Sequence, residues 1–158
     1  MKELKDSAQK VQGELNKLGY ENRVMELPDS TRTAKEAADA LGCSVGQIAK
    51  SILFCLKNAN EPVLVVASGS NRINEQEVEK NLNDKLGKAD ADFVREQTGF
   101  VIGGVPPLAH QEPIMTFIDQ DLFDYDEIWA AAGHPKAVFK LTPVELEKMT
   151  GGKVIAVK

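Results

Sequence analysis

The chain has 158 residues, of which 42% are hydrophobic and 27% charged, with a formal net charge of −5. This length suits one domain, residues 1–158, that folds without disulfides or structural metal. The absence of a long apolar run or signal-like start predicts a cytoplasmic protein. The acidic balance excludes a protein that grips a long stretch of nucleic acid through its phosphates. Three possibilities remain. The protein binds no nucleic acid, it contacts only a small part of one, or a partner protein supplies most of the binding.

The N-terminal third begins with an amphipathic pattern. Apolar residues recur every three or four positions from Leu4 to Leu18, which predicts a helix over residues 3–18. Gly19 follows as a typical C-terminal cap. Residues 20–27 are then expected to form a short strand.

Later helix starts are marked by the capping-box pattern, a Ser, Thr or Asn followed three positions later by Glu or Gln. The start residues are Thr33, Ser44, Asn74 and Thr142. They predict helices over about 33–41, 44–49, 74–82 and 142–149, and a further helix is expected near 90–97.

Runs rich in β-branched and aromatic residues predict the strands. They cover residues 51–56, 62–68, 99–103, 116–119, 127–131, 137–141 and 153–157. The turn-like segment KNANEP is expected to join the first two into a hairpin. Because strands and helices alternate irregularly and several connections are short, we predict an α/β (α+β) fold. Its centre would be a mixed, largely antiparallel β-sheet or partial barrel surrounded by helices.

Lys50 stands directly before the apolar run Ser51–Leu56. In one interpretation its methylenes cover apolar surface while its ammonium reaches water. In the other, the ammonium is fixed at the floor of a pocket, where it would bind a phosphate or stabilise developing negative charge. The residues alone leave both interpretations open.

Two loops have the composition of ligand-binding turns. Gly103 and Gly104 let the backbone approach a ligand closely, and Pro106 and Pro107 stiffen the segment that follows. His134 lies in a Gly-His-Pro loop between two predicted strands, where it would orient a substrate or a water molecule. An ordinary turn and a solvent-exposed histidine are the alternatives.

Metal and nucleophile chemistry have little support in the sequence. Cys43, Cys55, His110 and His134 show none of the spacings of a zinc site. The chain has no Gly-x-Ser-x-Gly element of a serine hydrolase. Both cysteines stand beside apolar residues and are expected to be buried, unreactive thiols. We therefore expect no metal and no cofactor.

Three fragments, in this order, resemble the YbaK/ProX family, which is related to the editing domain inserted in bacterial prolyl-tRNA synthetases. RTAKEAADALGCSVGQIAKSILF (Arg32–Phe54) resembles the family's helix–helix–strand signature, with Lys50 at the position of its pocket lysine. GGVPPLAH (Gly103–His110) resembles the glycine-to-proline loop, and AAGHPKAVFKLTPVEL (Ala131–Leu146) resembles the last motif. The resemblance covers nearly the whole chain.

The resemblance implies a trans-editing aminoacyl-tRNA deacylase that hydrolyses the ester of a mischarged tRNA, usually tRNA-Pro, without a metal. Lys50 would sit near the 3′-terminal phosphate and adenosine, and the Gly103–Pro107 loop would hold the aminoacyl group and help to place the attacking water. His134 would contact the aminoacyl end or the water. The other expected substrate-binding residues are Ser51, Gly103, Gly104, Pro107 and Gly133, with Leu27, Ile48 and Val105 as candidates for an apolar wall.

The substrate is less well defined. The branch that acts on Cys-tRNA typically has a Gly-Arg-Arg-like stretch where this chain has Gly133-His134-Pro135, so the resemblance favours a small amino acid such as Ala, with Cys as the other option. An enzyme that reads mainly the acceptor 3′ end needs few phosphate contacts, which agrees with the acidic charge.

The expected partner is mischarged tRNA, presented by prolyl-tRNA synthetase or an elongation factor, to a monomer or weak homodimer that binds no membrane. The alternatives are a non-catalytic module that binds aminoacyl-tRNA or a synthetase, and a hydrolase of small amino-acid esters.

Overall fold

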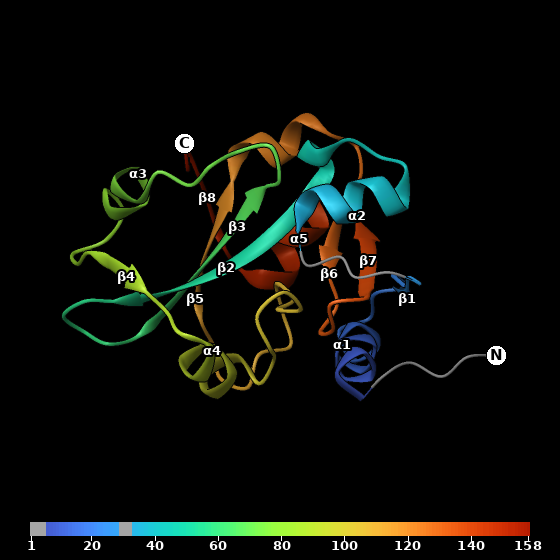
Figure 1. The fold of residues 1–158 in the computed structure, drawn as a ribbon, viewed down its shortest axis with the longest axis horizontal. Coiled ribbons are helices and arrows are strands. Elements are labelled where there is room, and N and C mark those ends of the chain that lie inside the picture. Colours follow the sequence, from blue (N-terminus) through green and yellow to red (C-terminus); the bar gives the residue numbers. More distant parts are fainter. Residues whose placement is uncertain (1–5, 29–32) are drawn as a thin grey trace.

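The computed structural model describes residues 6–28 and 33–158, and Figure 1 shows their arrangement around one central sheet. In chain order the elements are α1 (Asp6–Lys17), β1 (Val24–Glu26), α2 (Ala34–Leu41), the 3₁₀ helix η1 (Val45–Gln47), β2 (Ile48–Leu56), β3 (Pro62–Ser68), α3 (Glu75–Glu79), β4 (Leu86–Lys88), α4 (Ala91–Thr98), β5 (Met115–Asp119), the 3₁₀ helix η2 (Gln120–Asp124), β6 (Ile128–Ala131), β7 (Ala137–Leu141), α5 (Pro143–Thr150) and β8 (Lys153–Ile155). No helix in these ranges is long and apolar enough to span a bilayer.

Helix ends follow the local chemistry of the sequence. The hydroxyls of Thr33 and Thr142 accept hydrogen bonds from the N–H groups three residues later, which confirms the predicted starts of α2 and α5. Gly42 and Gly151 end the same two helices in the left-handed conformation, where glycine carries no Cβ penalty. Residues 3–5 of the predicted first helix lie outside the described residues.

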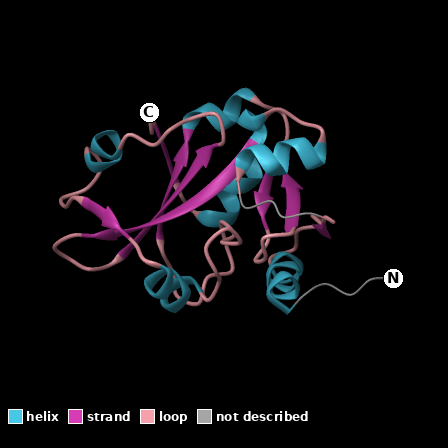
Figure 2. Cartoon of the chain, viewed as in Figure 1, coloured by secondary structure: helices cyan, strands magenta, loops and turns pink. Residues whose placement is uncertain are grey.

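The strands form one mixed sheet in the order β1-β7-β6-β2-β3-β5-β8, with β4 paired to β2 beside this path. The β2–β3 hairpin is antiparallel, as predicted, and so are the β1–β7, β6–β7 and β2–β4 pairs. The β2–β6, β3–β5 and β5–β8 pairs are parallel. Figure 2 shows helices surrounding and overlying this sheet, so the predicted mixed fold is confirmed.

Three local predictions were wrong. Residues 99–103 form no strand, because Gly99 ends α4 in the left-handed conformation and Phe100 turns into the core, where it is 2% exposed. The helix predicted at 44–49 is only η1, so Lys50 lies inside β2 rather than at a helix end. The short strand β4 was not predicted, since three residues carry no clear period.

The apolar side chains fall into two main groups. The larger one combines α1, one face of the central strands, β6, β7 and the loop after α4. The smaller one lies on the other face of β2 and β3, beneath α3 and β8. Alternation of side chains along β2 and β3 divides residues between these cores, and a third small cluster joins α2 to Ile48 at the start of β2.

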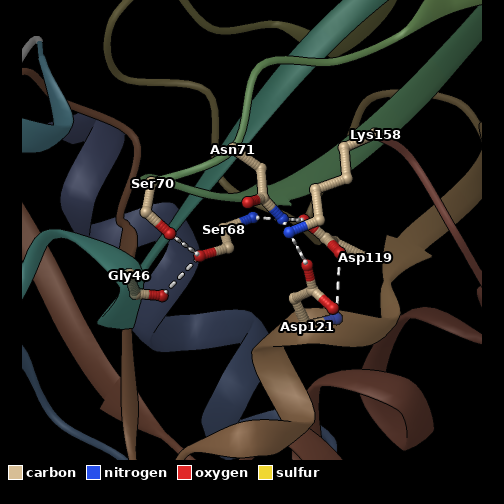
Figure 3. A network of polar contacts seen from close by, with 7 residues as sticks. All are labelled: Gly46, Ser68, Ser70, Asn71, Asp119, Asp121 and Lys158. Carbon is tan, nitrogen blue, oxygen red and sulfur yellow. Dashed lines mark hydrogen bonds and ion pairs between the residues drawn. The ribbon is translucent and has the colours of Figure 1, made fainter.

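A buried carboxylate organises the ends of β3 and β5 (Figure 3). Asp119 is 1% exposed. It accepts hydrogen bonds from the Ser68 backbone N–H at 3.0 Å, the Asn71 amide at 2.8 Å and the Asp121 backbone N–H at 2.9 Å. Because these donors satisfy it, the carboxylate is tolerated in the interior.

The same network reaches the segment that leads into β2. The Ser68 hydroxyl donates to the Gly46 carbonyl at 2.8 Å and lies 3.1 Å from the Ser70 hydroxyl. At the outer end, the Asp121 carboxylate accepts a hydrogen bond from the Asn71 amide and lies 3.4 Å from the Lys158 ammonium. The network therefore fixes η1, and with it the entry to the strand that carries Lys50.

Candidate functional site

One edge of β2 is paired along most of the strand, and the other is paired only at its ends. β3 covers the first edge. On the second edge β6 pairs with Ile48 and Ala49, and β4 pairs with Phe54–Leu56 (Figure 1). Within the described ranges, Lys50–Leu53 therefore have no partner strand on this edge, and the sheet has a gap where β6 and β4 diverge.

Backbone bonding at the two ends of β2 shows which groups face the gap. The C=O of Ile48 and the N–H of Leu56 both bond to the chain on the β3 side. In an antiparallel pair, the residues between them alternate between the two edges. The even-numbered residues of β2 consequently face β3, while Ser51 and Leu53 direct both N–H and C=O towards the gap.

A cavity of about 790 Å³ opens onto this gap. Its walls come from β2, the start of α2, the Val101–Val105 segment, β6 and β7. Among the described residues that line it, Lys50 carries the only charge, and Thr33 and Ser51 carry the only side-chain hydroxyls. The described part of the lining is thus mainly apolar, with one cation.

Lys50 itself is half-buried. No carboxylate in the described part of the chain lies within ion-pairing distance of its ammonium. A cation in low-dielectric surroundings without a counterion interacts strongly with an anion that enters. This arrangement fits the second of the two interpretations of Lys50, an ammonium facing a pocket.

A second cavity of about 510 Å³ lies towards β4. The two cavities share the residues Ser51, Ile52, Ile102, Gly103 and Val105. Glu75 and Lys88 add one charge of each sign to the second cavity. We call the two joined cavities the β2 cleft.

The Gly103–Pro107 segment, which we call the Gly/Pro loop, closes one side of the cleft and begins with a tight turn. The Gly104 N–H donates to the Val101 carbonyl at 3.0 Å, and Gly103 between them has a φ of 91°. This turn leaves Ile102 55% exposed above the cleft, whereas Val105 is 5% exposed and anchors the loop in the core. Glycine is required at position 103 because side chains rarely adopt this φ.

The Gly/Pro loop packs directly on the Gly-His-Pro loop. A Cβ placed on Gly104 would lie 2.9 Å from both the N and the Cα of His134. The His134 ring accepts a hydrogen bond at Nδ1 from the Lys136 N–H at 3.1 Å. The structure thus brings the two predicted loops together, although His134 is not among the residues that line either cavity.

The other predicted residues divide in the same way. Ile48, Ser51, Gly103 and Val105 line the main cavity with Lys50. Four predicted residues lie outside this cavity: Leu27, Gly104, Pro107 and Gly133. The Leu27 N–H donates to the Lys136 carbonyl, and Gly133 packs against Phe100 and α1. None of these four residues lines either cavity of the β2 cleft.

His110 holds the Gly/Pro loop from behind. Its Nε2 lies 2.7 Å from the Pro106 carbonyl, which can only accept, so Nε2 carries the proton. Burial lowers the pKa of His110 below its ordinary value, although the bond to Pro106 acts in the opposite direction. His110 and Pro107 border a separate cavity of about 430 Å³.

Several lining residues were missed by sequence reasoning. Val101 and Ile102 border the cavity from the loop, and Trp129 borders it from β6. The exposure of Val101 and Ile102, 41% and 55%, is visible only in the structure, so their position directly before Gly103-Gly104 was the available signal. Trp129 gave no signal, since its role depends on the parallel pairing of β6 with β2.

The cysteines are free, but both are half-buried, so the prediction of buried thiols was wrong. Burial nevertheless raises the pKa of the Cys43 thiol, which keeps it protonated and poorly nucleophilic. Within the described residues, no group of three or more His, Cys, Asp or Glu side chains is arranged to hold a metal ion.

Known proteins resemble this chain over most of its length. The aminoacyl-tRNA editing domain model matches residues 28–149. The chain is 31% identical over 150 residues to the uncharacterized protein YwhH of Bacillus subtilis (strain 168), covering 94% of each chain. It is 32% identical over 94 residues to a proline–tRNA ligase of Limosilactobacillus fermentum, which is 57% of this chain and 16% of the ligase.

A solved structure gives the same result in three dimensions. The crystal structure of a protein provisionally assigned as a trans-editing enzyme for prolyl-tRNA synthetase superposes with a TM-score of 0.93. Sequence identity is 45%, and the match covers 99% of both chains. The similarity therefore extends over the whole fold, including the strands and loops that form the β2 cleft.

Proposed function

The chain belongs to the aminoacyl-tRNA editing domain family, and on that premise we propose that it is a trans-acting deacylase. Its reaction would be hydrolysis of the ester that joins a wrong, small amino acid, Ala or Cys, to the 3′ end of tRNA-Pro. The similarities to a proline–tRNA ligase and to a protein assigned to prolyl-tRNA editing support this choice of tRNA.

The observation that carries the proposal is the ammonium of Lys50, which has no ion-pair partner among the described residues and is the only charged group among the described residues that line the main cavity. The 3′ end of a tRNA brings a phosphate next to its terminal adenosine. A single half-buried cation suits a ligand that presents one anionic group at a defined place. It also explains how an acidic protein can bind RNA, because few phosphates need to be contacted.

The main cavity also fits the substrate in size and polarity. Its volume of about 790 Å³ lies within the range of about 300–1,000 Å³ typical of small-molecule sites. Ile48 and Val105 contribute buried apolar walls, at 6% and 5% exposure. Such walls select by size, at about 1–3 kcal/mol per methylene.

The proposed chemistry is direct attack of water on the ester carbonyl. No histidine lines either cavity of the cleft within the described residues, so neither Ser51 nor Thr33 has a neighbouring histidine base that would make it a nucleophile. Water adds to the carbonyl carbon, the tetrahedral intermediate collapses, and the ester oxygen leaves as the tRNA hydroxyl with a proton. The protein's contribution would be positioning by Lys50 and the Gly/Pro loop, and stabilisation of the oxyanion by backbone N–H groups.

His134 has a positioning role in this proposal. Its backbone backs Gly104 at van der Waals contact, so it fixes the loop that would hold the aminoacyl group. The alternative role is direct contact of its ring with the aminoacyl end or the water, although the ring lines neither cavity. Replacement by alanine separates these roles, because the backbone contact with Gly104 survives the loss of the ring.

A deacylation panel tests the proposal. Ala-, Ser-, Thr- and Cys-tRNA-Pro are incubated with the wild type and with Lys50→Ala, His134→Ala and Lys57→Ala. Lys57 is an exposed lysine just beyond β2 and outside the cleft, so its variant controls for the loss of one charge. We expect Lys50→Ala to lose at least about tenfold in kcat/KM and Lys57→Ala to match the wild type.

A folded Lys50→Ala protein with full activity on its best substrate would remove the lysine from the mechanism. Tight binding of every aminoacyl-tRNA without turnover would support a binding module instead. Equal hydrolysis of a free amino-acid ester and the tRNA ester would indicate a small-ester hydrolase. The proposal has three further parts. Prolyl-tRNA synthetase or an elongation factor would present the mischarged tRNA, the reaction would take place in the cytoplasm, and the protein would be a monomer or a weak dimer.

A further inference from the structure

The hydroxyl of Ser51 is an exception in this structure. It is the only buried side-chain oxygen or nitrogen of the described residues without a hydrogen-bond partner. A hydroxyl buried without a partner is costly, so a native protein that keeps one usually uses it. Ser51 also lies where the two cavities of the β2 cleft join, which is the place where a ligand spanning both would pass.

The backbone of Ser51 is open at the same point. Its N–H and C=O both face the gap between β6 and β4, as the alternation along β2 shows. One residue in extended conformation fits such a position, because an antiparallel partner exchanges two hydrogen bonds with the residue opposite it. An aminoacyl ester has the two groups that this exchange needs, an α-ammonium and a carbonyl.

We propose that the aminoacyl group of the substrate binds the β2 cleft as a one-residue strand paired with Ser51. The α-ammonium donates to the Ser51 C=O, and the ester carbonyl accepts from the Ser51 N–H. That N–H then stays bonded to the oxygen that becomes the oxyanion when water adds. This inference rests on the proposed deacylase function and specifies how the site would recognise the acyl group.

The pairing also determines where the amino-acid side chain lies. Directly opposed residues of an antiparallel pair place their side chains on the same face, with Cβ atoms about 4.5–5.5 Å apart. The substrate side chain therefore lies beside the Ser51 hydroxyl, and a β-hydroxyl on the substrate would supply its missing partner. The pairing therefore extends the proposed range of substrates from alanine and cysteine to serine, and it favours serine over alanine.

The position of Lys50 is compatible with this pose. Neighbouring side chains of a strand point to opposite faces, so the Lys50 ammonium is separated by the strand from the substrate's side chain. The cation can then serve the phosphate while the α-ammonium of the substrate bonds to the strand edge. Like charges are thereby kept apart within one cleft.

The test compares seryl and alanyl esters of tRNA-Pro. The wild type should hydrolyse the seryl ester with a kcat/KM about tenfold above the alanyl ester, as one neutral hydrogen bond provides. Ser51→Ala should bring this ratio close to one. Thr150→Ala is the control. It removes a hydroxyl that lies far from Ser51 in the sequence and already donates to the Leu146 carbonyl, so this variant should keep the wild-type ratio.

Two further measurements test the backbone pairing. A propionyl ester lacks the α-ammonium, so the Ser51 C=O loses its donor, and the rate enhancement over uncatalysed hydrolysis should be at least about tenfold smaller for this ester than for the alanyl ester. Ser51→Pro removes the edge-facing N–H without breaking a bond to β3. It should therefore be slower than Ser51→Ala on both aminoacyl esters, provided that its thermal unfolding remains cooperative.

Each outcome has a distinct meaning. Failure of the wild type to hydrolyse any ester would overturn the deacylase function itself. An equal loss on seryl and alanyl esters in Ser51→Ala would overturn the side-chain placement, because the hydroxyl would then serve a group common to both substrates. An equal rate enhancement over uncatalysed hydrolysis for the propionyl and alanyl esters would overturn the strand pairing, even if Ser51→Pro does not fold.

Discussion

Gly104→Ala should destabilise the protein by forcing apart the two loops behind the cleft. Gly104 does not have a positive φ, so its backbone conformation accepts alanine. The added Cβ, however, would lie 2.9 Å from His134 N and Cα and 3.0 Å from its C. All three atoms belong to the backbone, and a backbone cannot rotate away as a side chain would.

The expected size follows from this overlap. Relief requires a shift of roughly 0.5 Å between the loops, and overpacking of this kind costs about 1–3 kcal/mol of unfolding free energy. For a domain of this size, each kcal/mol corresponds to about 2–4 °C, which predicts a fall in Tm of roughly 2–12 °C. Deacylation by the folded variant should also fall on the order of tenfold, because the loop that holds the aminoacyl group is displaced.

Thermal unfolding followed by circular dichroism measures the effect, with Gly13→Ala as the matched control. Gly13 lies within α1, and a Cβ there meets nothing within 4 Å. Alanine is the better helix former by about 0.5–1 kcal/mol, so this variant should be slightly more stable than the wild type. The same chemical change should therefore have opposite signs at the two positions.

A Gly104→Ala protein that unfolds at or above the wild-type Tm would refute the contact between the loops. A normal Tm combined with lost activity would mean that the loops separate without cost and that Gly104 acts on the substrate directly.

Three further predictions concern residues that support the site. Asp119→Asn should lower the unfolding free energy by about 1–3 kcal/mol, because its NH₂ group would face N–H donors; a urea titration that shows no change would contradict this. Because the pKa of His110 is lower in the folded state, the histidine is protonated in the unfolded chain at a higher pH than in the folded one. The free energy of unfolding should therefore fall as the pH drops below about 6.5. His110→Gln keeps a donor for Pro106 without titrating, so its Tm should fall less than that of the wild type, and parallel Tm–pH curves would exclude the effect. Gly133→Ala should cost more than Gly104→Ala, because its φ of 91° adds backbone strain to a clash with Phe100, and a smaller loss of Tm would count against that strain.

Much of the fold could be predicted because it depends on local chemistry. Capping residues fixed the starts of α2 and α5, and β-branched runs fixed β2 and β3. The failures came where tertiary packing overrides local pattern. The run Gly99–Gly103 has strand composition, yet the burial of Phe100 and the positive φ of Gly103 turn it into the loop beside the cleft.

The candidate site could be predicted only in part, for a similar reason. The sequence showed an isolated lysine before an apolar strand and two loops of unusual composition. It could not show that β6 and β4 pair with opposite ends of one edge of β2, since strand pairing depends on contacts distant in sequence. The open edge at Ser51, and the residues that line it from β6, follow from that pairing.

The open edge also has a structural cost that the fold limits. An unpaired strand edge is a template for aggregation. Here the gap is restricted to Lys50–Leu53 by paired segments on both sides, and Val101, Ile102, Gly103 and Val105 line the same cleft. A gap of this length is too short to recruit a full strand, but it is long enough for a single residue. The shortness of the gap thus protects the sheet from pairing with a second chain, and the same shortness would restrict the cleft to an aminoacyl group.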